Sequence, residues 1–316
     1  MTTRLQGGRW LLLLIGAAFL AGVLCSAWLR PLTIDEAISF HYVQGRSWYQ
    51  LLNPLANTIA NHHLFVSAWM KSLGALGQSV FWLRLLSLAC AVCYMLGVLQ
   101  LFASHRRLPA LVGVAALLLN VFVIEHFSLA RGYSLMLAAG IWLLYFWSKP
   151  QPLATARRAA VVATLGAVAT LANFSFVIFM AGLLLARPSV LWEAAKRWRV
   201  ALPFAAIYGM ALLYAALSLH TLRTYAHLGY GGADNVFSDT FMSLARASAM
   251  VSPTAQPLWL VALCASLLLG HLALTLLVFK GPAGWIGRVF WLSVLLEVLL
   301  FELTGTRYLL DRTALF

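Results

Sequence analysis

Two adjacent carboxylates, Asp35 and Glu36, lie just beyond the first long apolar run of the chain, residues 10–29. One carboxylate at such a place can act as a general base, while the second supports it or binds a metal ion. Thr33 to Glu36 also match a capping box, in which Thr33 caps a helix and Glu36 bonds back to the Thr33 amide. Both residues are catalytic candidates. We expect Glu36 to fit the cap better and Asp35 to be the freer side chain.

A second polar cluster, Asn61-His62-His63, opens an amphipathic segment. Neighbouring histidines on a helix point about 100° apart, so the pair by itself is a poor shared metal site. One of them could still meet Asp35 or Glu36, which makes Glu36 and His62 the candidate ligands of a divalent metal. The alternative is a polar cap at the start of the helix. The sequence requires no cofactor.

A third cluster covers residues 125–133 and contains Glu125, Arg131 and Tyr133. An arginine here can bind a phosphate as a bidentate donor, or it can pair with Glu125. Farther along, Glu297 lies deep in an apolar run, where a carboxylate is costly. It is either a functional group or a paired packing residue.

The composition defines the elements that must position these residues. Of the 316 residues, 62% are hydrophobic and 10% are charged, whereas a soluble domain carries about 25% charged residues. Too few polar residues remain to cover a soluble fold, and a membrane supplies the missing apolar solvent. The four cysteines lie in apolar runs and predict neither a disulfide framework nor a zinc site.

The apolar runs predict an all-α, polytopic transmembrane helix bundle of about nine spans. Residues 159–186 are long for one span and contain a polar break at Asn173-Phe174-Ser175, so they form either one helix or a tight hairpin of two short helices. We take the hairpin, because it keeps the basic cluster Lys196-Arg197-Trp198-Arg199 inside. The other expected spans are 10–29, 81–103, 109–127, 133–148, 200–219, 257–279 and 289–304. Residues 30–80 form the first outer loop, with amphipathic helices in the interface plane. We expect one integral domain, residues 1–316.

The charges sort to opposite sides of this topology. The formal charge of +13 comes from short basic clusters, which indicate topology and lipid head-group contact rather than nucleic-acid binding. Seven of the nine acids fall at or near the outer face, which directs the search for chemistry to that side. Thirteen of the 22 basic residues fall inside: Arg4, Arg9, Arg106, Arg107, Lys149, Arg157, Arg158, Arg187, Lys196, Arg197, Arg199, Lys280 and Arg288.

The order of these motifs resembles that of polytopic glycosyltransferases with the GT-C fold, namely glycosyltransferase family 39 with its protein O-mannosyltransferase and aminoarabinose transferase relatives. In that group an acidic motif follows the first span, as Thr33-Ile34-Asp35-Glu36 does here. A polar stretch comes next, then an Arg-x-x-Ser helix start and an Ala-Arg-x-Tyr turn. Their counterparts here are Asn61-His62-His63, Arg84-Leu85-Leu86-Ser87 and Ala130-Arg131-Gly132-Tyr133. The resemblance covers roughly residues 10–190 well.

The resemblance implies sugar transfer from a polyprenyl-phosphate donor to a lipid, glycan or protein hydroxyl. The active site would face the periplasm or exterior of the plasma (inner) membrane. Asp35 would be the general base, and Arg131 with Tyr133 would bind the donor phosphate, where negative charge develops. The residues that would orient Asp35, the acceptor or a metal are Glu36, Asn61, His62 and His63.

Two features depart from the family pattern. The Pro-Pro form of the second motif is absent, and the sequence ends at Phe316, where family members continue with further spans. We therefore expect a C-terminally truncated chain. The alternatives are a membrane transporter or lipid flippase, and a catalytically inactive remnant. A transporter would place ionisable groups near the midplane between repeated halves, and no repeat is visible.

Overall fold

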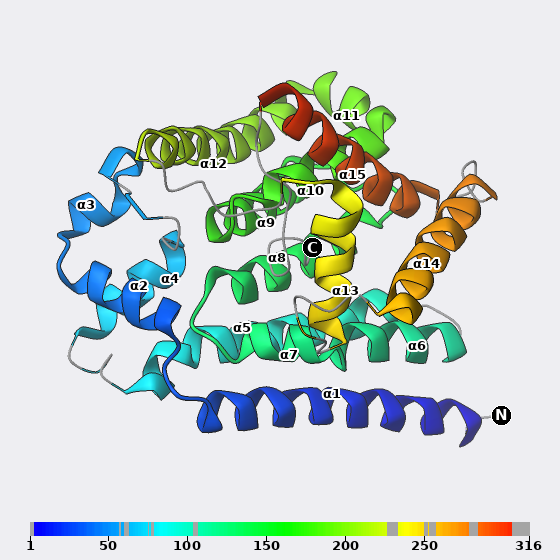
Figure 1. The fold of residues 1–316 in the computed structure, drawn as a ribbon. Coiled ribbons are helices and arrows are strands. Elements are labelled where there is room, and N and C mark those ends of the chain that lie inside the picture. Colours follow the sequence, from blue (N-terminus) through cyan, green and yellow to red (C-terminus); the bar gives the residue numbers. More distant parts are fainter. Residues whose placement is uncertain are drawn as a thin grey trace. The chain divides into compact units, whose positions relative to one another are not determined.

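All regular secondary structure in the described part of the chain is helical. The computed structural model describes residues 3–56, 58–59, 63–74, 76, 79–103, 107–225, 233–249, 252, 257–277 and 284–304. They form fifteen α-helices together with short 3-10 and π segments (Figure 1). The all-α prediction is confirmed for these residues.

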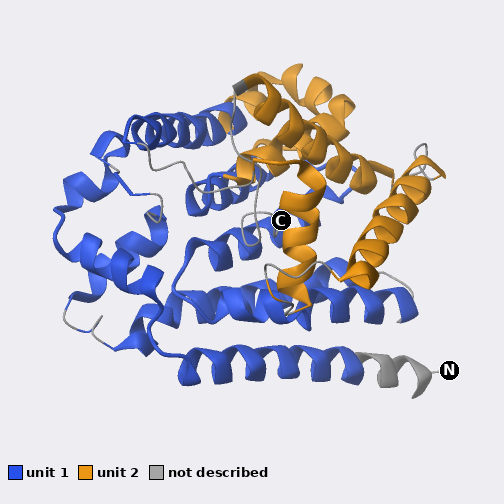
Figure 2. Ribbon diagram, viewed as in Figure 1, with its two compact units in different colours: residues 1–152, 157–174, 204–227 blue, residues 153–156, 175–203, 228–316 orange. Residues whose placement is uncertain are grey.

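The helices group into two compact units (Figure 2). Unit 1 consists of residues 1–152, 157–174 and 204–227. Its helices are α1 (Thr3–Leu29), α2 (Ile34–Gln44), α3 (Trp48–Leu52), α4 (Leu64–Leu73), α5 (Val80–Phe102), α6 (Arg107–Leu118), α7 (Val121–Phe127), α8 (Gly132–Trp147), nearly all of α9 (Ala156–Ala172) and most of α12 (Trp198–Thr224). A 3-10 turn, η1, covers Pro54–Ala56.

Unit 2 consists of residues 153–156, 175–203 and 228–316. It contains α10 (Phe176–Ala186), α11 (Pro188–Ala195), the start of α12, the π-helix η3 (Phe237–Met242), α13 (Ser243–Ser248), α14 (Leu258–Leu277) and α15 (Gly284–Thr304). Helix α10 packs against α15, and α15 packs against α14. The border between the units within α12 falls beside Pro203, which removes one backbone hydrogen bond from the helix.

Four of the described helices are long and apolar enough to cross a membrane: Trp10–Leu29, Val80–Phe102, Trp198–Thr224 and Leu258–Leu277. The number rises to six if each of two bent helix pairs forms one span. In the helix Leu258–Leu277, only 17% of the apolar 18-residue stretch is buried, so most of the helix surface presents apolar side chains outward. Lipid is the solvent such a surface requires, and the chain is an integral, multi-pass membrane protein.

Two of the expected spans contain breaks. The expected span 109–127 consists of α6 and α7, which are bent by 53°, because Asn120 caps α7 by accepting a hydrogen bond from the Phe122 amide at 2.9 Å. The break predicted within 159–186 is confirmed, since α9 ends at Ala172 and α10 begins at Phe176. Helix α8, with 16 residues, spans about 24 Å, less than the hydrocarbon core of about 30 Å.

The helices of the first loop are anchored by an apolar cluster in unit 1. Val43 of α2, Leu51 of α3, Met70 of α4 and Leu83 of α5 are nearly fully buried together, and Ala130 joins them from the turn before α8. Full burial of a valine, leucine or methionine side chain stabilises a fold by about 1.5–3 kcal/mol. The cluster therefore holds α2, which carries the acidic pair, next to the turn that carries Arg131.

Candidate functional site

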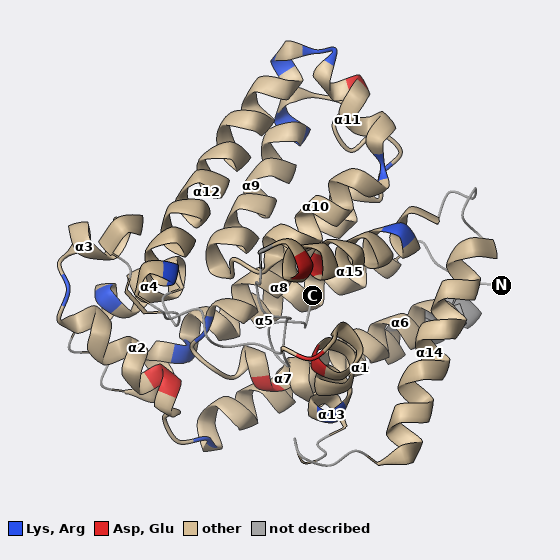
Figure 3. Cartoon of the chain, turned by 45° about the horizontal axis from the view of Figure 1, so that its top comes forward, with Lys and Arg blue, Asp and Glu red and all other residues tan. Residues whose placement is uncertain are grey.

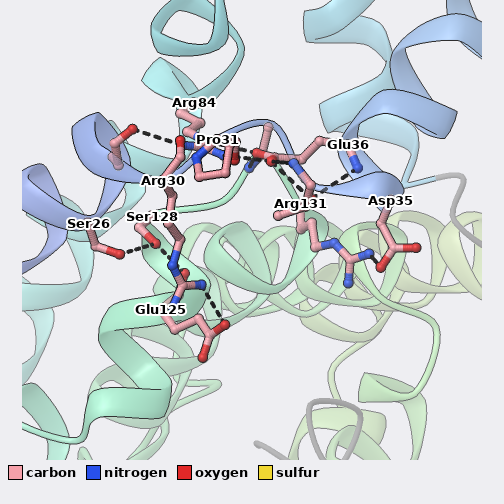
Figure 4. A network of polar contacts seen from close by, with 12 residues as sticks. Ser26, Arg30, Pro31, Asp35, Glu36, Arg84, Glu125, Ser128 and Arg131 are labelled. Carbon is pink, nitrogen blue, oxygen red and sulfur yellow. Dashed lines mark hydrogen bonds and ion pairs between the residues drawn. The ribbon is translucent and has the colours of Figure 1, made fainter.

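The buried ion pair between Glu36 and Arg84 is the centre of the polar network in Figure 4. Both side chains have 0% exposure. Arg84 Nε donates to Glu36 Oε1 at 2.9 Å, and Arg84 Nη2 donates to Glu36 Oε2 at 2.7 Å. This is the bidentate arrangement that a guanidinium makes best with a carboxylate.

The remaining N–H groups of Arg84 bind the end of α1. Nη1 donates to the carbonyls of Ala27 and Arg30 at 2.8 and 2.9 Å, and Nη2 donates to that of Pro31 at 2.9 Å. Carbonyls at a helix C-terminus lack partners within the helix. Because a guanidinium has five N–H donors, all of them are used, and Arg84 joins α5, the end of α1 and α2.

Glu36 in turn positions the turn before α8. Its Oε1 accepts from the amide of Ala130 at 2.8 Å, and its Oε2 accepts from the amide and hydroxyl of Thr33 at 2.9 and 3.0 Å. The predicted capping box is confirmed. Burial by itself opposes ionisation and is the largest single effect on the pKa of Glu36, but the hydrogen bonds from Arg84, Ala130 and Thr33 together lower that pKa below its ordinary value.

Asp35 and Arg131 form the second ion pair of the network. The side chain of Arg131 is 7% exposed and that of Asp35 is 30% exposed, so the carboxylate is reached from outside while the guanidinium is mostly covered. Arg131 is the N-cap residue of α8 and follows directly on Ala130, whose amide binds Glu36. Asp35 is therefore more exposed than Glu36, and it lies against the predicted phosphate-binding arginine (Figure 4).

Glu125 has a different partner from the one considered from sequence. Arg30 Nη1 donates to Glu125 Oε1 at 2.5 Å, and both side chains are about one-third exposed. Next to this pair, Ser26 donates to Ser128 at 3.0 Å. Arg131 is thus paired with Asp35 and Glu125 with Arg30, which overturns the alternative in which Arg131 pairs with Glu125.

A histidine and a tyrosine meet beside this network. The ring centroids of His63 and Tyr133 are 5.6 Å apart, and those of His126 and Tyr133 are 5.0 Å apart. Nδ1 of His63 is 2.8 Å from the carbonyl oxygen of Ala172. His63 is the N-cap residue of α4, but its side chain makes no capping hydrogen bond, so the polar-cap interpretation is wrong for His63.

Gly132 permits this close approach. A Cβ atom on Gly132 would overlap the carbonyl oxygen of Ala172 and would lie 2.7 Å from Cγ of His63. The absence of a side chain therefore lets the start of α8, the end of α9 and the start of α4 meet. Arg131 and Tyr133, on either side of Gly132, are placed by this contact.

Of the predicted site residues, the structure brings Asp35 to Arg131 and His63 to Tyr133, with Glu36 beneath the Arg131 turn. Asn61 and His62 lie outside the described residues. Within the described ranges, no group of three or more His, Cys, Asp or Glu side chains lies close enough together to bind a metal ion. All the acceptor atoms of Glu36 already receive hydrogen bonds from the protein, so metal binding there would require their replacement.

Arg84 is a site residue that the search for chemistry did not select. Its signal was present, because an arginine within a long apolar run requires a partner. In unit 2, Glu297 accepts a hydrogen bond from the Thr240 hydroxyl at 2.6 Å and is 6% exposed. This contact agrees with the interpretation of Glu297 as a paired packing residue.

In comparisons with protein families, with curated proteins and with solved structures, nothing matches this chain. The resemblance to GT-C glycosyltransferases therefore stays a prediction that depends on the motifs and on the site geometry.

Proposed function

We propose that this chain is a membrane glycosyltransferase that moves a sugar from a polyprenyl-phosphate donor to an acceptor hydroxyl. The observation that carries the proposal is the contact between Asp35 and Arg131. A general base and a phosphate-binding cation have to flank one reaction centre, because the attacked anomeric carbon lies between the acceptor oxygen and the leaving phosphate, and the direct ion pair would open to admit the sugar between them.

In the proposed reaction, Asp35 accepts the proton of the acceptor hydroxyl as that oxygen attacks the anomeric carbon. The bond between the anomeric carbon and the phosphate oxygen breaks, and its electron pair leaves with the polyprenyl phosphate. Arg131 neutralises the additional negative charge on this leaving group, which is where a fixed cation accelerates the step most. Tyr133, one residue beyond Gly132, lines the same turn.

The ion pair also couples donor binding to the release of the base. A phosphate that binds Arg131 competes with Asp35 for the same guanidinium. Its binding therefore weakens the ion pair and leaves the Asp35 carboxylate available for the acceptor proton. Glu36 and Arg84 take no part in the chemistry in this scheme and keep the Arg131 turn in place through the Ala130 amide.

The proposal includes the membrane arrangement expected from the sequence. It comprises about nine spans in the plasma (inner) membrane, with Asp35 and Arg131 at the periplasmic or exterior face beside the lipid head groups. Support comes from the position of α2 directly after the candidate span Trp10–Leu29. A lipid-linked donor could then reach the site from the bilayer.

Donor turnover tests the proposal. Membranes containing the chain are given a panel of radiolabelled polyprenyl-phosphate sugars, and loss of label from the donor is followed. We expect turnover of at least one sugar by the wild type and none by Asp35→Asn at equal membrane insertion. Asp234→Asn, the same change on an exposed acid of unit 2, is the matched control and should retain turnover.

Two outcomes contradict the proposal. Absence of wild-type turnover across the panel removes the activity, and full turnover by Asp35→Asn removes the base assignment.

A further inference from the structure

Several Lys and Arg residues of unit 2 lie at or near helix ends, where they colour the cartoon blue (Figure 3). Arg187 follows α10, Lys196 and Arg197 follow α11, Arg199 is in the first turn of α12, and Arg288 is in the first turns of α15. The guanidinium of Arg187 lies 5.8 Å from the ring centroid of Trp285 in α15, and the charge of Arg288 acts on Arg187. These contacts join the end of α10 to the start of α15. Five cations thus accompany a single acid in this region, Glu193.

One of these cations has a structural role. Arg197 donates to the carbonyls of Leu153 and Ala154 at 3.0 and 2.9 Å and to that of Glu193 at 3.2 Å. It therefore fixes the turn between α11 and α12 to the segment 153–156. Because its N–H groups already bind backbone carbonyls, we do not include Arg197 among the cations that could bind a ligand.

Lys196 and Arg199 are different, because each lies over an exposed tryptophan. Lys196 Nζ is 5.6 Å from the ring centroid of Trp192, and the guanidinium carbon of Arg199 is 5.4 Å from that of Trp198. Both tryptophans are 66% exposed. Lys196 also pairs with Glu193 at 2.9 Å, but both side chains are more than half exposed, so this pair is weak. Exposed tryptophan beside a cation is the composition of a membrane–water interface.

The direction of α11 agrees with such a position. Helix α11 is bent by 82° from α10, so the two helices are close to perpendicular. If α10 is oriented along the bilayer normal, α11 lies along the membrane surface, as interfacial helices do. A tryptophan and a lysine near its end then lie at head-group depth.

We propose that α11 and the turn after it, with Lys196, Arg199, Trp192 and Trp198, form a docking surface for the head group of an anionic phospholipid. The lipid phosphate meets Lys196 and Arg199, while the two indole rings lie among the glycerol and upper acyl atoms. Charge complementarity selects the anionic lipid over a zwitterionic one. The surface belongs to unit 2 and is independent of the chemistry proposed for Asp35 and Arg131.

Thermal stability of the full chain in mixed micelles tests this surface. Purified protein in a neutral detergent receives phosphatidylglycerol, phosphatidylcholine, or inorganic phosphate at the same phosphorus concentration, and the apparent melting temperature is measured. We expect phosphatidylglycerol to raise it above the value in phosphatidylcholine, and inorganic phosphate to leave it unchanged. In the double variant Lys196→Gln/Arg199→Gln, the difference between the two lipids should fall by about half or more.

Two further variants separate charge position from charge number. Arg223→Gln/Arg246→Gln removes the same charge elsewhere and should retain the lipid difference of the wild type. Lys196→Arg/Arg199→Lys keeps both charges in place and should also retain it. The proposal is overturned if both lipids stabilise the wild type equally, if inorganic phosphate replaces phosphatidylglycerol, or if the two charge-removing variants respond alike.

Discussion

The guanidinium of Arg131 forms an ion pair with the carboxylate of Asp35, and the residue before Arg131 donates its backbone amide to Glu36. Adjacent residues of α2 thus bind adjacent residues of the turn before α8. The carboxylate of Glu36 is buried and binds the neighbouring segments together, while that of Asp35 is partly exposed. This division makes Asp35 the more exposed acid of the two, in agreement with its proposed role as the base.

Replacing Arg131 tests its role as the phosphate-binding cation. We expect Arg131→Gln to lower donor turnover by about a hundredfold or more, the usual cost of removing a donor from developing negative charge. Arg131→Lys should fall between this variant and the wild type, because it keeps the charge but loses the bidentate fork. Turnover is measured at saturating donor. Arg30→Gln, which removes the exposed pair with Glu125, is the control, and an equal loss in this control would contradict a specific role for Arg131.

The buried pair predicts a pH-dependent stability. Glu36→Gln leaves the Arg84 charge buried without a counter-charge and should destabilise the fold by about 3 kcal/mol near neutral pH. The pKa of Glu36 in the folded protein lies below its ordinary value of 4.5, so the unfolded chain takes up the proton first as the pH falls. The stabilisation is therefore fully present above pH 4.5 and is lost as the pH falls through the lower folded pKa.

Melting curves of wild type and Glu36→Gln in detergent, from about pH 7 down to about pH 3, measure this effect. The gap between the two proteins should be wide at the upper end and should close on acidification. A gap that stays constant across this range would show that the charge of Glu36 contributes nothing to stability.

Gly132 provides a steric prediction. In Gly132→Ala the new methyl group would overlap the Ala172 carbonyl and press on His63, and we expect a loss of about 1–3 kcal/mol. Gly209→Ala in α12 is the matched control, because a Cβ there meets nothing within 4 Å. It should be neutral or should stabilise by about 0.5–1 kcal/mol, since alanine favours a helix interior. Comparable melting temperatures for the two variants would contradict the close contact at Gly132.

Membrane sidedness gives a fourth prediction. Single cysteines are introduced at the exposed positions Gln50 and Ala195 of a variant whose four native cysteines are replaced. A membrane-impermeant maleimide applied from outside should label position 50 in intact cells and position 195 only after permeabilisation. Labelling of both from outside would contradict the proposed topology, in which the first loop and the basic end of unit 2 lie on opposite sides.

The sequence predicted the helical class and the local elements well because their signals are local. Long apolar runs indicated the four longest candidate spans, and the polar break at Asn173 correctly separated two helices. Thr33 and Glu36 predicted their own capping box, since both partners lie within one turn. The bend at Asn120 was missed because the apolar residues around it indicate one continuous span, whereas the asparagine side chain favours capping a new helix.

The site itself depends on contacts between segments that are distant in the sequence, and the spacing of residues along the sequence does not predict such contacts. Arg131 could pair with the nearby Glu125 or with any outer acid, and only the packing of α2 against the turn before α8 selects Asp35. Arg84 shows the same limit, since its position in an apolar run indicates that it has a partner without identifying Glu36. The meeting of His63 with Tyr133 likewise requires the close approach at Gly132.

The five hydrogen bonds of Arg84 join the end of α1 and the start of α2 to α5, and Glu36 adds the Arg131 turn by accepting from the Ala130 amide. A bilayer whose acyl chains are too short or too long makes a spanning helix tilt. Here α1 cannot tilt by itself, because its final carbonyls would leave a buried cation. We therefore expect mismatch between lipid and protein to move α2 and the Arg131 turn together, and the spacing of Asp35 and Arg131 to be the same in membranes of different thickness.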